Sequence, residues 1–141
     1  MNTTLLTYLL QLAGGLHLGL ICAGATMPRV VNLREHLGTL PAFIRRLFLV
    51  YFVFIGFILV CFGTLTFLFA NAMAMGEPVA RALCVVMLVF WFIRLIAGAV
   101  VFDVRPYLTN WFYRSGYVAL NTVFLYLLFV YAIAAWRGGR I

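Results

Sequence analysis

The chain has 141 residues, of which 67% are hydrophobic and 9% are charged, and its formal net charge is +7. A soluble domain carries about 25% charged residues, so this composition excludes a water-soluble fold of this length. All of the positive charge comes from arginine, because the sequence contains no lysine. Without a soluble basic domain we expect no nucleic-acid binding. The arginines instead favour contact with anionic lipid headgroups.

Four apolar runs follow one another along the chain, and each is long enough to cross a bilayer as a helix, which takes about 20 residues. A membrane span must satisfy its own backbone polar groups, and the runs lack the alternation of strands, so all four are predicted to be helices. The sequence therefore predicts a single all-α integral membrane domain over residues 1–141, an up-down four-transmembrane-helix bundle. The predicted helices cover about residues 5–27, 47–75, 79–102 and 117–136.

The first predicted helix carries a run of small residues. Ala23-Gly24-Ala25 resembles a signal-peptide cleavage site, but no basic residue precedes the apolar run and Gly14 and His17 interrupt it, so we expect this segment to remain. Small residues at every fourth position let helices approach closely in lipid. They predict a packing face, used either within the chain or by another subunit, that is formed by Gly15, Gly19 and Ala23.

His17 lies near the middle of the same predicted helix. An ionisable residue at that depth faces a partner or a cavity and is a candidate site by default. The only other histidine is His36, in the following loop, which excludes a haem held by two histidines. Two interpretations stay open, a hydrogen-bonded packing histidine and a single haem ligand. No cofactor is predicted in the first case.

The segment between the first two helices has its own pattern. Val30, Leu33, Leu37 and Leu40 recur at helical spacing, and most of the residues between them are polar. This predicts a short interfacial amphipathic helix over about residues 29–39, lying in the headgroup plane. Further along, the sequence over 76–78 predicts a tight turn, with Pro78 in the first turn of the third helix.

Arginine counts predict the orientation. The loops at 28–46 and 103–116 hold six arginines, and the other side holds Arg81, Arg137 and Arg140. The positive-inside rule places both loops in the cytoplasm and both termini outside, as in a bacterial inner-membrane protein. Basic residues at that membrane face are a predicted surface for lipid headgroups or a partner protein, comprising Arg29, Arg34, Arg45, Arg46 and Arg114.

Arg94 lies about eight residues before the end of the third predicted helix, or about 12 Å deep at 1.5 Å per residue. An unpaired arginine at that depth is costly, so we expect an anionic partner. Asp103, Glu35 or a bound anion could supply it. The candidate ligand-binding residues are therefore His17, Arg94, Asp103 and Arg105.

Motifs for catalysis or metal binding are absent from the sequence. The three cysteines lie inside apolar runs without CxxC spacing, so neither a disulfide framework nor a zinc site is predicted. There is no HExxH motif, no paired carboxylates and no glycine-rich phosphate loop.

A histidine midway along the first of four helices, Pro28-Arg29 soon after it, and Arg46-Leu47-Phe48 at the start of the second helix form a further pattern. It resembles small four-helix families such as bacterial membrane-bound protoporphyrinogen oxidase. In that family a first-helix histidine is linked to haem, and the resemblance implies His17 as the matching position. It spans about a third of the chain, and the later segments show no matching pattern.

These observations favour a non-catalytic structural or accessory subunit that packs within a larger membrane complex, as a homo-oligomer or with other proteins. The alternative is a membrane enzyme or redox protein that binds haem, quinone or an isoprenoid-like or anionic lipid near His17 and Arg94. A transporter is disfavoured, because only these two residues offer a polar path across the core.

Overall fold

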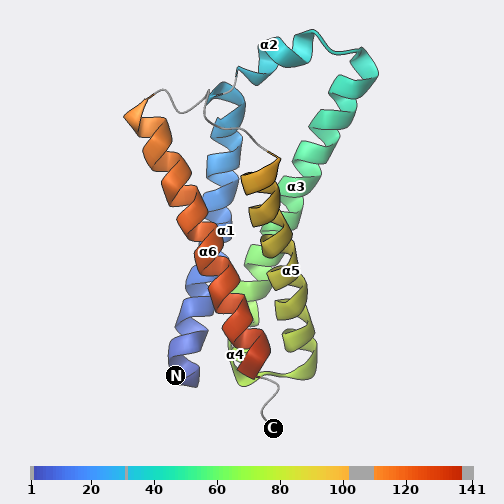
Figure 1. Ribbon diagram of the computed structural model, residues 1–141. Coiled ribbons are helices and arrows are strands. Elements are labelled where there is room, and N and C mark those ends of the chain that lie inside the picture. The colour runs from blue at the N-terminus through green and yellow to red at the C-terminus, as the bar shows by residue number, and fades with distance from the viewer. Residues whose placement is uncertain (1, 31, 102–109, 138–141) are drawn as a thin grey trace.

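The computed structural model describes residues 2–30, 32–101 and 110–137 (Figure 1). The described residues are helical apart from short connections, and four helices are long and apolar enough to cross a membrane. These are α1 (Thr3–Val30), α3 (Ala42–Leu68), α5 (Pro78–Val100) and α6 (Trp111–Arg137). Over the described residues, the prediction of an all-helical chain with four helices suited to spanning a membrane is confirmed.

The beginning of α1 and the end of α6 lie at one end of the molecule, and the short helix α2 (Leu33–Gly38) lies at the other (Figure 1). The predicted boundaries need correction here. α1 continues through Pro28 to Val30. The φ angle of proline fits a helix, and its missing N–H and the crowding of its ring against the carbonyl of Gly24 affect only the last turn. The predicted interfacial helix over 29–39 is therefore shortened to the six residues of α2, in which Leu37 is buried and Arg34 is exposed.

The second apolar run is divided in two. α3 begins at Ala42, directly after Pro41, and ends at Leu68, and α4 (Ala70–Met75) follows it. Phe69 separates them with φ −100° and ψ 16°, outside the usual range of an α-helix. The single helix predicted for 47–75 is wrong at this point. The bend gives α4 a direction of its own and buries Ala70, Met73 and Ala74.

The turn from α4 to α5 follows from its residue types. Gly76 has φ 78°, a left-handed conformation that glycine adopts without strain. Its N–H donates to the carbonyl of Ala72 at 3.0 Å, and the N–H of Glu77 donates to the same carbonyl at 3.1 Å, which closes the end of α4. Pro78 is the first residue of α5, so the predicted turn over 76–78 is confirmed.

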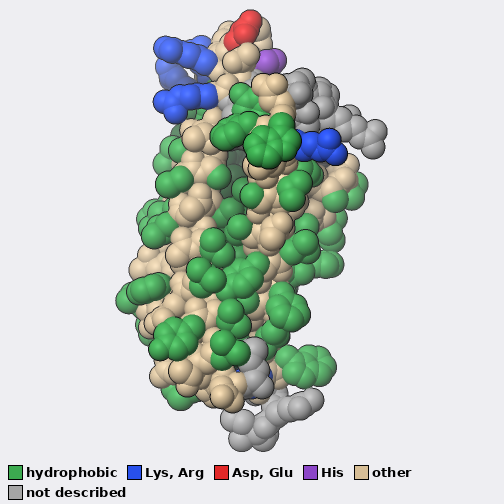
Figure 2. All heavy atoms as spheres, turned by 90° about the vertical axis from the view of Figure 1, so that its left-hand side faces the viewer, with side chains coloured by type: hydrophobic (Ala, Val, Ile, Leu, Met, Phe, Trp, Pro, Cys, Tyr) green, Lys and Arg blue, Asp and Glu red, His purple; other side chains and the backbone are tan. Residues whose placement is uncertain are grey.

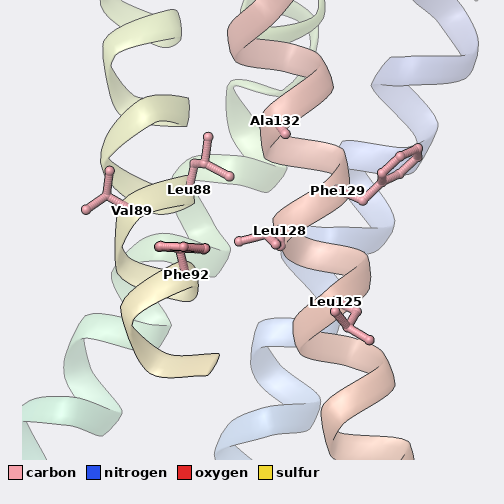
Figure 3. A pocket seen from close by; sticks show the side chains of 7 residues that line it. All are labelled: Leu88, Val89, Phe92, Leu125, Leu128, Phe129 and Ala132. Atoms are coloured by element: carbon pink, nitrogen blue, oxygen red, sulfur yellow. The ribbon is translucent and has the colours of Figure 1, made fainter. Parts of the chain in front are cut away.

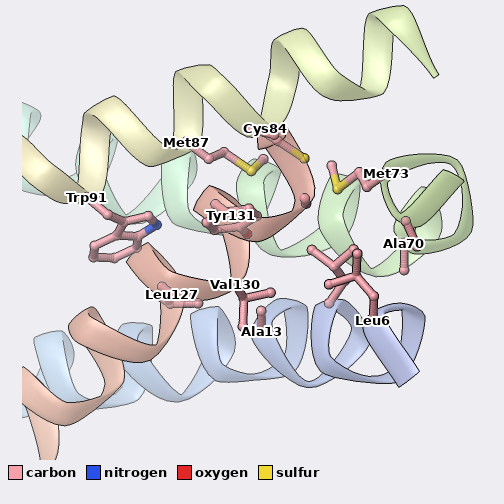
Figure 4. Packing of buried hydrophobic residues seen from close by; sticks show 14 of the residues in the cluster. Leu6, Ala13, Ala70, Met73, Cys84, Met87, Trp91, Leu127, Val130 and Tyr131 are labelled. Carbon is pink, nitrogen blue, oxygen red and sulfur yellow. The ribbon is translucent and has the colours of Figure 1, made fainter. Parts of the chain in front are cut away.

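The buried core is made mainly by α1, α4, α5 and α6 (Figure 4). In Figure 4, Trp91 and Met87 of α5 and Tyr131 of α6 lie among side chains from α1 and α4. One third of the most apolar stretch of α1 and of α6 is buried, against 6% of that of α3. α3 therefore contributes little to the core, and the other described helices leave most of its surface uncovered.

α1 and α3 approach most closely at two glycines. A Cβ atom placed on Gly14 would lie 2.9 Å from the carbonyl oxygen of Gly63, and one on Gly63 would lie 2.9 Å from the Cβ of His17. Such distances exclude any larger residue unless the backbones separate. The close contact of α1 within this chain is therefore made by Gly14.

The predicted packing face, by contrast, is exposed in the described part of the chain. Gly15, Gly19 and Ala23 are exposed, and a Cβ on either glycine would meet nothing within 4 Å. This face points away from the buried residues of α1, such as Ala13 and His17, which favours the second of its two predicted uses. Its use by another subunit stays a prediction.

Candidate functional site: a buried histidine cluster

His17 is fully buried in the middle of α1. Its Nδ1 lies 2.7 Å from the carbonyl oxygen of Ala13, one turn earlier in the same helix. A carbonyl can only accept, so Nδ1 carries the proton and donates this bond. In the neutral ring Nε2 is then an acceptor.

Aromatic rings from the three other long helices surround the imidazole. Their centroids lie 5.4 Å away for Trp91 of α5, 6.3 Å for Tyr131 of α6 and 6.4 Å for Phe62 of α3. All three pairs are edge-to-face, a favourable geometry for aromatic contacts. All four long helices thus meet around His17.

A second polar group lies beside the histidine. The hydroxyls of Thr66 on α3 and Tyr131 on α6 are 2.7 Å apart, and the Thr66 hydroxyl donates to the sulfur of Met87 on α5 at 3.4 Å. A threonine hydroxyl has one hydrogen, so Tyr131 is the donor to Thr66. Neither Thr66 nor Tyr131 was predicted from the sequence to be part of a site. The available signal was a polar side chain, Thr66, inside the most apolar of the four helices.

Two buried nitrogen atoms in the cluster, His17 Nε2 and Trp91 Nε1, have no hydrogen-bond partner among the described residues. His17 Nε2 is a hydrogen-bond acceptor and Trp91 Nε1 is a hydrogen-bond donor, so the cluster offers one buried acceptor and one buried donor. The described residues contain no group of three or more histidine, cysteine or acidic side chains that could hold a metal ion. The chemistry that these two atoms offer is hydrogen bonding, with Nε2 as acceptor and Nε1 as donor.

Arg94 does not share this buried site. Its side chain is exposed, and its guanidinium carbon lies 5.3 Å from the centroid of the Phe124 ring. Phe124 in turn packs against Trp91 with centroids 5.1 Å apart. His17 and Arg94 are thus connected through two aromatic rings, Trp91 and Phe124. Asp103 and Arg105, predicted to complete the site, lie outside the described residues.

The predicted headgroup surface gathers at one end of the molecule. Arg29 ends α1, Arg34 lies on α2, Arg45 and Arg46 lie in the first turns of α3, and Arg114 lies in the first turn of α6. Figure 2 shows arginine side chains near the α2 end and hydrophobic side chains along the length of that face. The arrangement fits a headgroup level at the α2 end.

A shallow groove runs between α5 and α6 on the outside of the molecule (Figure 3). All of its lining side chains are hydrophobic: Leu88, Val89, Phe92, Leu125, Leu128, Phe129 and Ala132. Without a polar group it cannot orient a reacting molecule. It therefore differs from the His17 cluster, which offers both a donor and an acceptor.

Comparisons with models of protein families, with curated proteins and with solved structures find no match to this chain.

Proposed function

We propose that this protein is a non-catalytic accessory subunit of a larger membrane complex. It would be an up-down four-helix bundle of the bacterial inner membrane, with both termini outside, the loops at 28–46 and 103–116 in the cytoplasm and α2 in the headgroup layer. The five described arginines at the α2 end against Arg81 and Arg137 at the other support this orientation.

The observation that carries the proposal is the outward face of α1. Gly15, Gly19 and Ala23 occupy successive turns, are exposed and point away from the buried side of the helix, which includes Ala13 and His17. Glycine does not improve the packing of lipid chains against a helix, whereas it lets the backbone of a second transmembrane helix approach closely. The occupant of this face is therefore a transmembrane helix of another subunit.

The test replaces Gly19 by leucine. Gly19→Leu should weaken the association without lowering the melting temperature, because a Cβ at this position meets nothing within 4 Å of its own chain. Gly116→Leu is the matched control, since Gly116 is also helical, exposed and open, but lies on α6. Native mass spectrometry of the complex measures the result.

Two outcomes would count against the proposal. If Gly19→Leu keeps the parent's assembly state, the outward face of α1 carries no subunit contact. If Gly116→Leu disturbs assembly equally, the effect is not specific to that face. Disulfide formation through exposed Cys22 on the same helix separates a second copy of this chain from a different partner, because only a second copy gives a homodimer.

A second candidate is the haem-binding redox protein that the resemblance implies. The observation in its favour is the buried Nε2 of His17, which has no partner among the described residues and is the atom that would ligate iron. Against it, three aromatic rings already pack around the imidazole. A visible spectrum of protein purified from haem-replete cells decides. The redox function requires a Soret band that His17→Ala abolishes.

A further inference from the structure

α1 and α3 touch near the middle of the molecule and separate toward the α2 end, where α3 leans away (Figure 1). The space beside the glycines of the two helices changes in the same direction. At Gly14 and Gly63 a Cβ would come within 2.9 Å of the opposite helix, whereas at Gly24 and Gly56 it would meet nothing within 4 Å.

The open glycines lie on the same helix faces as the closed ones. Gly24 follows His17 by seven residues, which is close to two helical turns, and His17 touches Gly63. Gly56 precedes Gly63 by the same interval. Among the described residues, the two facing surfaces therefore touch at Gly14 and Gly63 and leave open space beside Gly24 and Gly56. We call this space the α1–α3 wedge.

The α3 side of the wedge is apolar and ends in a charge. Phe52 and Leu59 are half-buried beside Gly56. Arg45 lies seven residues before Phe52, so it shares this face of α3 at the wide end of the wedge. An apolar wall thus leads up to an exposed guanidinium in the first turn of the helix.

The wide end is strongly basic. Between residues 29 and 46 the chain carries Arg29, Arg34, Arg45 and Arg46 against one acidic residue, Glu35. All five are exposed at the ends of α1, α2 and α3. Clusters of this kind attract anionic lipids, and each arginine near the headgroup layer adds to the attraction.

We propose that the α1–α3 wedge binds one anionic phospholipid, with its phosphate at Arg45 and an acyl chain along Phe52 and Gly56. A second transmembrane helix fits less well, because a helix is about 10 Å wide over its whole length and cannot follow a space that narrows to contact at Gly14 and Gly63. A flexible acyl chain can taper into it. The site lies on the inward face of α1, opposite Gly19, and does not depend on the subunit contact.

The first experiment tests the headgroup. The full-length protein is purified in detergent with a mixture of phosphatidylglycerol and phosphatidylcholine, and retained lipid is measured by native mass spectrometry. Arg45→Gln should reduce retained phosphatidylglycerol about fivefold, the change expected from one basic residue near the headgroups. Arg46→Gln removes the same charge from the neighbouring position on a different helix face, and should have a much smaller effect.

Equal losses in the two variants would mean general attraction to a basic surface and would overturn the site. Retention of phosphatidylcholine at the same level as phosphatidylglycerol would overturn the choice of an anionic headgroup.

The second experiment tests the acyl chain. Gly56→Trp should fill the wedge and abolish retention, whereas Phe54→Trp, at an exposed position on the opposite side of α3, should keep it. A phosphatidylglycerol with a diazirine in its acyl chain provides a readout on the unmodified protein, which keeps the test independent of any folding defect in Gly56→Trp. It should crosslink to Phe52 and Gly56 in preference to Phe54. Crosslinks distributed evenly around α3 would show ordinary surrounding lipid and contradict the proposal.

Discussion

The guanidinium carbon of Arg94 lies 5.3 Å from the centroid of the Phe124 ring, one helix away. The negative face of an aromatic ring attracts a cation, and at exposed positions this contact stabilises by about 0.5–1 kcal/mol. The Phe124 ring therefore forms part of the environment that keeps this charge within an apolar helix.

We predict that Arg94→Gln and Phe124→Leu are coupled. A double-mutant cycle on the free energy of unfolding in detergent should give a coupling of about 0.5–1 kcal/mol. Arg46→Gln with Phe124→Leu is the control pair and should give none. A coupling of zero for Arg94 would mean that the ring does not stabilise the charge.

The same position tests the predicted partner Asp103. If the two side chains form an ion pair, Arg94→Leu alone should destabilise the protein more than Arg94→Leu with Asp103→Asn, because removing one partner leaves a charge uncompensated. Equal melting temperatures of the two variants would exclude this pairing.

Gly14 and Gly15 are adjacent but have opposite surroundings. Gly14→Ala should lower the free energy of unfolding by about 1–3 kcal/mol, because its Cβ would be forced against the backbone of Gly63. Gly15→Ala should be neutral or stabilising, since the space there is open and alanine favours helix. Thermal unfolding of both variants in the same detergent measures the difference, and equal melting temperatures would contradict the close contact.

The hydroxyl pair of Thr66 and Tyr131 should behave as a unit. Tyr131→Phe and Thr66→Val should each destabilise by about 1 kcal/mol, and the double variant by less than the sum, because the second change no longer breaks a bond. Thr122→Val combined with Tyr131→Phe is the control pair and should be additive. The exposed hydroxyl of Thr122 donates to the carbonyl of Val118 in its own helix. Additive effects would show that the two hydroxyls are not coupled.

The orientation is tested by cysteine labelling in a background without native cysteines. Arg34→Cys and Asn110→Cys should react with an impermeant maleimide only from the cytoplasmic side, and Glu77→Cys only from the outside. All three positions are exposed, so access to the reagent is set by the membrane. Labelling of the position-77 variant from the cytoplasm would reverse the proposed orientation.

The sequence predicted what depends on length and local chemistry. The four long helices follow from the lengths of the apolar runs. The turn follows from Gly76, which adopts a positive φ without strain, and from Pro78, which suits the first turn of a helix. The depth of His17 follows from its position in the first span. These features can be predicted without knowing which helices pack against one another.

The rest depends on which side of a helix meets its own chain. In a membrane, side chains that face lipid are as apolar as those that face the core, so hydrophobicity cannot separate them. α1 has two small-residue faces, and only the structure shows that Gly14 packs within the chain while Gly19 points outward. For the same reason the partnership of Thr66 with Tyr131, 65 residues apart, could not be predicted.

One contact at the opposite end from α2 has a consequence for biogenesis. The Nε of Arg81, in the first turn of α5, donates to the carbonyl oxygen of Ala135 in the last turn of α6, 3.0 Å away and 54 residues later. A ribosome delivers the arginine to the membrane long before the carbonyl that it will meet. α5 can therefore insert into the membrane before its Arg81 forms the hydrogen bond with α6. A chain that ends before Ala135 would therefore insert into the bilayer without the hydrogen bond that joins α5 to α6.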